Sequence, residues 1–210
     1  MRSLAILGAG GQGRVVADCA EALGWEQIAF FDDCSVPRPG TPWPLAGSTA
    51  DLLSRPGDFD GVIVGIGANA DRLSWQERLR VAGASLAILI HPRATVSAHC
   101  RIGAGTVVFA GAVINVGANV GESCIINTAA TVDHDCTLAE GVHISPGAHL
   151  GGDVTVGRGS WIGLGASVRQ GIVIGANARV GAGAVVVRPV PENETYAGVP
   201  ARLLVREPNA

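Results

Sequence analysis

The feature of this 210-residue chain that most constrains its fold is a six-residue repeat, which runs through the C-terminal half. From Val96 to Val186, every sixth residue is valine, isoleucine or leucine. The positions are Val96, Ile102, Val108, Ile114, Val120, Ile126, Val132, Leu138, Ile144, Leu150, Val156, Ile162, Val168, Ile174, Val180 and Val186. A second column, two residues before each aliphatic, holds only small or β-branched residues. A period of six matches neither a helix nor a simple alternating strand.

The repeat fits a short strand followed by a tight corner, and three such units make one triangular coil of eighteen residues. We expect the large aliphatic to fill the core and the small residue to sit where walls approach. We expect the Gly or Asn that often follows the aliphatic, as at Gly121 and Asn127, to relieve the corner. Stacked coils bury one another's apolar columns. The pattern therefore predicts a parallel β-helix over residues 91–210 and leaves its handedness open.

Residues 1–90 follow another pattern, in which short apolar strands alternate with helical segments. The predicted strands are 4–7, 28–31, 62–66 and 86–90, and the predicted helices are 14–23 and about 71–82. This alternation is typical of a small, doubly wound parallel sheet. The predicted fold class is therefore mixed, with a Rossmann-like α/β domain followed by a β-helix.

A glycine turn joins the first predicted strand to the first helix. It contains Gly10, Gly11, Gln12 and Gly13. Backbone N–H groups at such a helix N-terminus suit a phosphate or pyrophosphate. Asp32 and Asp33 follow about 20 positions later, where an acidic residue can hold a ribose or a base. The pattern also fits an NAD site, but a second nicotinamide-binding half is missing, which favours a nucleotide sugar. A turn that only packs helix on strand remains a third interpretation.

Composition excludes several functional classes. A net charge of −3 with 16% charged residues offers no basic surface for nucleic acid. The chain has no apolar run of the ~20 residues needed to cross a bilayer, and its N-terminal apolar stretch is too short for a signal peptide, so we expect a cytoplasmic protein without a membrane partner. The five cysteines show no metal-ligand spacing, so we expect neither disulfides nor a metal.

One segment of the repeat carries residues suited to catalysis. His134 stands two places after a core aliphatic, which predicts an outward-facing corner, and Asp133 and Asp135 flank it. Such a histidine can act as a general base, with a carboxylate raising its basicity and fixing its tautomer. Gly152 lies eighteen residues later, directly above on the same edge, and its open N–H could hold a thioester oxyanion.

Further along the repeat, the corners suit a long ligand. Leu164 and Ala182 are eighteen residues apart and share an edge, along which coenzyme A could lie between two prisms. The tail from Tyr196 to Arg202 is expected to close the last coil, whose open strands would otherwise invite aggregation. Arg202 could then meet a coenzyme phosphate.

These residues together resemble the bacterial hexapeptide-repeat acyltransferases typified by sialic acid O-acetyltransferases and nucleotide-4-amino-sugar N-acetyltransferases. The resemblance covers almost the whole chain and rests on GAGGQG, FDD, VGIGAN, IHPRATVS, INTAATVDHDC, HISPGAHLGG and AGVPARLL. It implies a homotrimer of left-handed β-helices with active sites between neighbouring subunits. Acetyl-CoA would be the cosubstrate, and a nucleotide sugar the acceptor in polysaccharide biosynthesis.

The resemblance also implies roles for single residues. His134 would be the base and Asp135 its partner. His143, Gly152, Leu164 and Ala182 map onto acetyl-CoA contacts, Asn127 onto the sugar site, and Gly13, Asp32 and Asp33 onto the nucleotide pocket. Relatives usually carry histidine where this chain has Gln12, which leaves the nucleotide open.

The expected reaction is acetylation of the amine of a nucleotide-linked amino sugar by direct attack on acetyl-CoA. O-acetylation of a sialic acid or related sugar needs the same base, so the residues do not separate the two reactions. A non-catalytic trimeric scaffold is the remaining alternative, which the Asp-His-Asp corner beneath two glycines disfavours.

Overall fold

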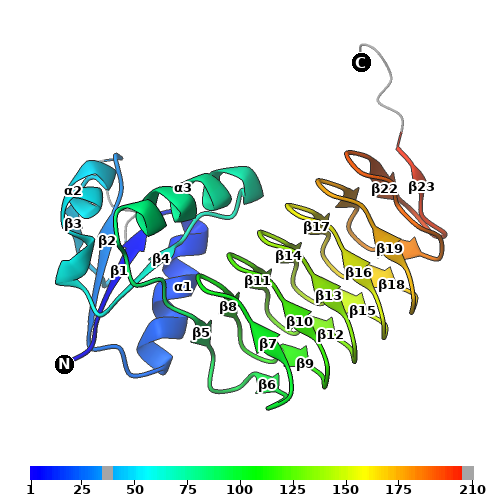
Figure 1. Ribbon diagram of the computed structural model, residues 1–210, viewed down its shortest axis with the longest axis horizontal. Helices are drawn as coiled ribbons and strands as arrows, with labels where there is room; N and C mark the ends of the chain where they lie inside the picture. The colour runs from blue at the N-terminus through cyan, green and yellow to red at the C-terminus, as the bar shows by residue number, and fades with distance from the viewer. Residues whose placement is uncertain (35–39, 205–210) are drawn as a thin grey trace, which may run out of the picture.

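The N-terminal part of the chain is a four-stranded parallel sheet with helices on both faces (Figure 1). We describe residues 1–34 and 40–204 of a computed structural model. The strands are β1 (Ser3–Leu7), β2 (Gln27–Phe31), β3 (Leu45–Gly47) and β4 (Gly61–Val64), in the order β3-β2-β1-β4. The helices are α1 (Gly11–Ala22), α2 (Thr49–Ser54) and α3 (Asn69–Val81), with a 3-10 turn η1 (Pro56–Asp58). The doubly wound sheet is confirmed. β3, α2 and η1 were not predicted, because segments this short carry little periodicity.

The two faces of this sheet pack against different partners, as strand alternation requires. Leu7 and Phe31 belong to a cluster with residues of α2 and α3 on one face. Ile6 and Phe30 point the other way, into a cluster that includes Val16 of α1 and side chains of the C-terminal part. Helix α1 is therefore packed between the sheet and the first coils of the β-helix (Figure 1).

The C-terminal part is a triangular prism of stacked two-residue strands, as predicted (Figure 1). Face 1 consists of β5 (Leu89–Ile90), β8 (Val107–Val108), β11 (Ile125–Ile126), β14 (His143–Ile144), β17 (Trp161–Ile162), β20 (Arg179–Val180), β22 (Thr195–Ala197) and β23 (Arg202–Leu203). Face 2 consists of β6 (Thr95–Val96), β9 (Val113–Ile114), β12 (Thr131–Val132), β15 (His149–Leu150), β18 (Ser167–Val168) and β21 (Val185–Val186). Face 3 consists of β7 (Arg101–Ile102), β10 (Asn119–Val120), β13 (Thr137–Leu138), β16 (Thr155–Val156) and β19 (Val173–Ile174).

The register of the prism confirms the eighteen-residue coil. Ile126 pairs in parallel with Ile144, and Ile144 with Ile162, so each core residue stacks on the one eighteen positions away. The second residue of each strand points inward, and most of the two predicted columns merge into one buried cluster. Burying a row of such side chains stabilises the prism by about 1.5–3 kcal/mol for each large aliphatic.

The corners differ from the expectation that the residue directly after the aliphatic relieves the turn. The left-handed backbone conformation falls on the third residue after the core aliphatic, as at Gly171 and Asp135, and not on the residue directly after it. The glycine directly after it answers a different constraint. A Cβ on Gly121 would lie 2.8 Å from the carbonyl carbon of Ala139 and 2.9 Å from the Glu140 nitrogen in the next coil. Glycine is needed there because successive coils approach closely.

Three edges join the faces, and the names below are kept throughout. The first edge joins face 1 to face 2 and carries Asn127, the second joins face 2 to face 3 and carries His134, and the third joins face 3 to face 1 and carries Gly141. The strand predicted at 86–90 is divided between the two parts. Leu86 makes an isolated bridge to Val62 of the sheet, whereas β5 pairs with β8 and opens face 1 of the prism.

The tail closes the last coil, as expected. β22 pairs in parallel with β20, and β23 turns back antiparallel on β22. Ala201 is buried, and its N–H donates to the Val185 carbonyl at 2.8 Å. Within the described part of the chain, every helix is too short or too polar to span a membrane.

Candidate active site

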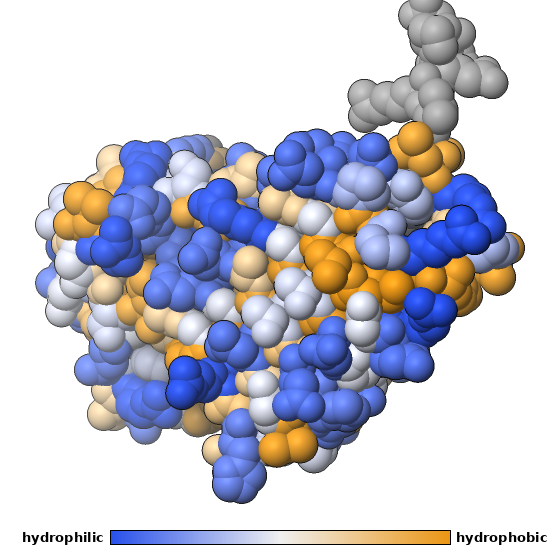
Figure 2. Space-filling model, turned by 45° about the vertical axis from the view of Figure 1, so that its right-hand side comes forward, coloured by the Kyte–Doolittle hydropathy of each residue, from blue (hydrophilic) through white to orange (hydrophobic). Residues whose placement is uncertain are grey.

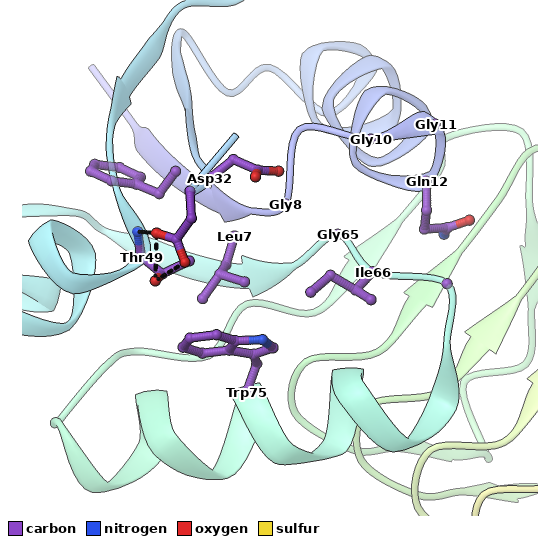
Figure 3. Close-up of a pocket in the computed structure, with 13 residues that line it drawn as sticks. Leu7, Gly8, Gly10, Gly11, Gln12, Asp32, Thr49, Gly65, Ile66 and Trp75 are labelled. Carbon is purple, nitrogen blue, oxygen red and sulfur yellow. Dashed lines mark hydrogen bonds between the residues drawn. The ribbon is translucent and has the colours of Figure 1, made fainter. Parts of the chain in front are cut away.

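The predicted glycine turn borders a cavity of about 350 Å³ in the N-terminal part (Figure 3). Trp75 of α3 forms one wall, opposite the turn (Figure 3). The lining residues are Leu7, Gly8, Gly10, Gly11, Gln12, Phe31, Asp32, Asp33, Thr49, Gly65, Ile66, Gly67 and Trp75. All the predicted nucleotide contacts of this part except Gly13 are therefore brought together. Trp75 and Thr49 were missed because they lie on separate elements that the glycine pattern does not mark.

Gly13 does not line this cavity. It is buried, and a Cβ there would overlap the Gly8 carbonyl oxygen. Gly13 therefore allows α1 to pack closely on the turn, which is the packing interpretation that the sequence left open for the motif.

The two aspartates of the cavity hold its backbone in place. Asp32 accepts hydrogen bonds from the N–H groups of Ala9 and Cys34, each at 2.8 Å. Asp33 accepts from the Thr49 N–H at 3.0 Å and from its hydroxyl at 2.9 Å. Each Asp32 oxygen accepts one of these bonds and can accept a second, and Asp33 Oδ2, which lies 2.9 Å from the Thr49 hydroxyl, also has a free acceptor position, so both residues can still bind a donor on a ligand.

Gln12 adds a donor at the end of the cavity nearest the prism (Figure 3). Its Nε2 atom is buried and has no hydrogen-bond partner among the described residues. A buried polar atom without a partner costs free energy, so a bound ligand that accepts from this amide would recover it.

The second edge carries a polarised histidine. His134 Nδ1 lies 2.9 Å from Asp135 Oδ2, and both side chains are exposed. The hydrogen bond to Asp135 raises the pKa of His134, and the negative charges of Asp133 and Asp153 act in the same direction. With Nδ1 engaged, Nε2 is the free nitrogen, and it is available to take a proton.

Gly152 lies against this free nitrogen, as the eighteen-residue period predicted. A Cβ on Gly152 would overlap His134 Nε2. The Gly152 N–H donates no hydrogen bond within residues 1–34 and 40–204, although its neighbour Asp153 donates to the His134 carbonyl at 2.9 Å. An unused backbone donor thus stands beside an unused imidazole nitrogen.

Three further hydrogen bonds stabilise this corner and were not predicted. Asp133 accepts from the His134 N–H at 2.8 Å and from the Asn115 amide at 2.7 Å, one coil below. The buried Cys136 thiol donates to the Gly151 carbonyl at 3.2 Å, and burial raises its pKa. Cys136 therefore points into the core, as its column predicted, and supports the corner rather than reacting.

Among the described residues, His, Cys, Asp and Glu side chains form no group that could hold a metal ion.

The first edge borders a groove of about 500 Å³ along the C-terminal coils. Figure 2, in which these coils come forward, shows apolar side chains gathered on this part of the prism. The groove is lined by Asn127, His143, Ser145, Pro146, Trp161, Gly163, Leu164, Arg179, Val180, Gly181, Ala182 and Thr195. The predicted residues Asn127, His143, Leu164 and Ala182 all lie in it. Arg202 is not among the lining residues, whereas Arg179 supplies a cation that sequence reasoning missed.

His143 is the polar centre of this groove. Its ring stacks on Trp161 with centroids 4.4 Å apart, and Nε2 lies 3.2 Å from Asn127 Nδ2. The Asn127 oxygen accepts from the Thr128 N–H at 2.8 Å, which sets the amide orientation. Because an amide nitrogen can only donate, Nε2 accepts and the ring proton sits on Nδ1. Burial, and then the charge of Arg72, lower the pKa of His143 to about 4, so the ring is neutral at neutral pH.

The predicted residues of the prism therefore fall on two different edges. His134 and Gly152 lie on the second edge, and the groove with Leu164 and Ala182 lies along the first. His134 does not line the groove; it borders a separate hollow of about 510 Å³ with Asn115 and Asp133. Within one chain, the polarised histidine and the groove are not in contact.

Comparison with known proteins identifies the family to which this architecture belongs. A family model described as the PglD N-terminal domain matches residues 3–79. The acetyltransferase domain of PglB from Neisseria gonorrhoeae superposes with a TM-score of 0.92 and 45% identity, over 97% of this chain and 100% of that one. PerB from Caulobacter crescentus, solved with CoA and GDP-perosamine, gives a TM-score of 0.92 and 37% identity over 98% of each chain.

A third solved structure, WeeI from Acinetobacter baumannii, gives a TM-score of 0.89 and 27% identity over 97% of this chain and 100% of that one. The search of curated proteins finds no match. The two structures with the higher identities match both parts of the chain together, the N-terminal sheet as well as the prism. The chain is therefore an acyltransferase and belongs to the hexapeptide-repeat sugar acetyltransferases, with a left-handed β-helix preceded by a PglD-type N-terminal domain.

Proposed function

We propose that the protein transfers the acetyl group of acetyl-CoA to the amine of a nucleotide-linked amino sugar. The observation that carries the proposal is the free Nε2 of His134 beside the unused N–H of Gly152. The relative from C. crescentus is a GDP-perosamine N-acetyltransferase, which supports an amino-sugar acceptor here. The N. gonorrhoeae domain has been solved with acetyl coenzyme A, which supports the same acyl donor.

The reaction needs only groups that these residues provide. The sugar amine attacks the thioester carbonyl while His134 Nε2 takes the amine proton. The Gly152 N–H stabilises the oxyanion of the tetrahedral intermediate. When the C–S bond breaks, the imidazolium returns the proton to the sulfur, and an amide and free CoA leave. Asp135 stabilises the charged imidazole in between.

The substrates occupy two different places in this proposal. The nucleotide lies in the cavity lined by Trp75, where Gln12, Asp32 and Asp33 can bind its polar groups. The coenzyme lies in the groove of the first edge, along Leu164 and Ala182, with Arg179 available for a phosphate. A cytoplasmic location fits this reaction, because acetyl-CoA and nucleotide sugars are made there.

Because the second-edge histidine and the first-edge groove are separate in one chain, the proposal includes a second copy. In a homotrimer, His134 of one subunit faces the groove of its neighbour, and each site uses two chains.

The test is a thiol-release assay with acetyl-CoA and a panel of UDP-, GDP-, TDP- and CMP-linked amino sugars. His134→Ala should lower kcat by about 10²–10⁴-fold, because the general base is lost. His99→Ala, at an exposed corner of the same edge, is the matched control and should retain wild-type turnover. Turnover of His134→Ala within a few-fold of the wild type would reject the assignment.

The product of the same reaction distinguishes N- from O-acetylation. Hydroxylamine cleaves an acetyl ester and leaves an acetyl amide intact, so treatment of the purified product identifies the acceptor atom. A hydroxylamine-stable product supports the amine as acceptor, and a labile one establishes a hydroxyl instead.

A further inference from the structure

Helix α3 presents a buried cation to the prism. The Arg72 side chain is 1% exposed, and all its five N–H groups donate to oxygen. Nε donates to Ser123 O at 2.8 Å, Nη1 to Ile66 O at 3.2 Å and Gly67 O at 2.9 Å, and Nη2 to Asn69 Oδ1 at 2.8 Å and Gly141 O at 2.9 Å. Within the described residues no carboxylate pairs with it, and burial lowers its pKa to about 10.

The contacts of α3 follow the coil repeat of the prism. Ser123, Gly141 and Gly159 are eighteen residues apart on the third edge, and each has a positive φ. Arg72 binds the first two carbonyls, and Asn69 donates to the third at 2.9 Å. The fit is geometric, because three helical residues rise about 4.5 Å and coils stack about 4.8 Å apart.

Gln76 continues the same face of α3 by one more coil. Its amide donates to the Ala104 carbonyl and to Glu122, each at 3.2 Å. Asn69, Arg72 and Gln76 are spaced three and four residues apart, so they form one buried polar stripe on the helix. The stripe runs along the third edge, where Figure 1 shows α3 beside the prism.

A buried, unpaired guanidinium is an energetically unfavourable way to hold α3 against the prism. A buried charge without a counter-ion is costly, and apolar packing would serve adhesion at least as well. What the guanidinium supplies instead is a fixed geometry, because its planar donors accept only one placement of five oxygens.

The residues that Arg72 holds in place lie between the two proposed substrate sites. Ile66 and Gly67, whose carbonyls it binds, line the nucleotide cavity. Asn69, which it orients, binds the Gly159 and Ser160 carbonyls directly before Trp161 of the groove.

We propose that Arg72, with Asn69, is a positioning residue that fixes the nucleotide cavity relative to the prism, so that the nucleotide-linked sugar is delivered to Asn127 and His143. This inference rests on the proposed function. Neither residue touches the reacting atoms; both act through the loop 66–69.

The test separates binding from delivery. In Arg72→Lys, a single ammonium replaces the planar five-donor fork, so the loop loses its fixed placement. We expect kcat with the nucleotide-linked amino sugar to fall on the order of 10²-fold, as for a misplaced substrate. The Kd values for the nucleoside diphosphate and for CoA, measured by calorimetry, should stay within about threefold of the wild type, because neither cavity loses a lining side chain. Asn69→Ala should show the same split more weakly.

Arg80→Lys is the matched control, because Arg80 lies on the same helix in an exposed pair with Glu77 and should leave kcat unchanged. The proposal is overturned if Arg72→Lys keeps kcat within twofold of the wild type. It is equally overturned if both Kd values rise as much as kcat falls in Arg72→Lys and Asn69→Ala, since that describes general loosening of the fold. Failure of the proposed function is a different result, in which the wild type itself acetylates none of the nucleotide amino sugars.

Discussion

At the scale of single residues, the proposed site contains two histidines held in opposite electrostatic states. His134 is exposed and hydrogen-bonded to Asp135, which stabilises its charged form and raises its pKa. His143 is buried on face 1 near Arg72, and both burial and that charge stabilise the neutral form. A base that cycles through the imidazolium needs the first environment, and a neutral hydrogen-bonding ring needs the second.

The pH dependence of turnover follows from the state of His134. As a base it must be neutral, so kcat/KM should rise with pH through a pKa above the usual 6.5. Asp135→Asn removes the carboxylate that stabilises the imidazolium, so the pKa falls and the acid limb moves to lower pH. The plateau should drop by about 10- to 100-fold, because the weaker base also loses its fixed tautomer.

The measurement is a pH–rate profile of both proteins between pH 5 and 9 at limiting sugar concentration. An acid limb at the same pH in Asp135→Asn would show that this carboxylate does not set the basicity of His134.

At the scale of elements, the prism depends on two kinds of glycine. One kind follows the core aliphatic and lies against the backbone of the next coil, as Gly121 does. The other kind is the third residue after the aliphatic and has a positive φ in open space, as Gly171 does. The repeat makes both kinds look alike in the sequence, but one avoids a clash with the next coil and the other allows a positive φ.

Alanine substitution should therefore separate the two kinds. Gly171→Ala should cost about 1–2 kcal/mol of unfolding free energy, the penalty of a left-handed residue with a Cβ. Gly121→Ala should cost more than about 3 kcal/mol, because its Cβ would press on the Ala139–Glu140 backbone, which cannot move without separating two coils. Chemical denaturation of both variants gives the comparison, and equal losses would contradict it.

At the scale of the whole molecule, the arrangement of the edges makes the proposed trimer part of the proposed site. His134 with Gly152 and the Leu164 groove lie on different edges of one prism, whose coils share a continuous buried core. A symmetric ring of three prisms can place one edge of each subunit against a different edge of the next.

Mixing two inactive variants tests this arrangement. His134→Ala removes the base, and Leu164→Arg blocks the groove at a side chain that is 58% exposed and therefore costs little stability. If each site takes one half from each of two subunits, random mixed trimers should recover about a quarter of wild-type activity. The check is co-expression followed by the thiol-release assay. Mixed trimers as inactive as either variant alone would place the whole site within one chain.

The sequence by itself determined the coil. The six-residue spacing identifies which side chains enter the core, and the eighteen-residue period places Gly152 above His134, because every coil repeats the same local path. The alternation of strands and helices likewise predicts the sheet, and the glycine turn locates the cavity in which we propose that the nucleotide binds. These features are visible in advance because each follows from the spacing of residues close together in the chain.

Tertiary structure alone decided how the parts meet. The prism carbonyls that Arg72 binds belong to Ser123 and Gly141, more than fifty residues away in the chain. Every residue carries a carbonyl, so no side-chain pattern marks these acceptors. The close packing of Gly13 on Gly8 could not be predicted for a similar reason, since it is set by how closely α1 approaches the turn. His134 and Leu164 are thirty residues apart, so the eighteen-residue period already puts them on different edges; what only the folded stack decided is that a groove opens beside the first edge.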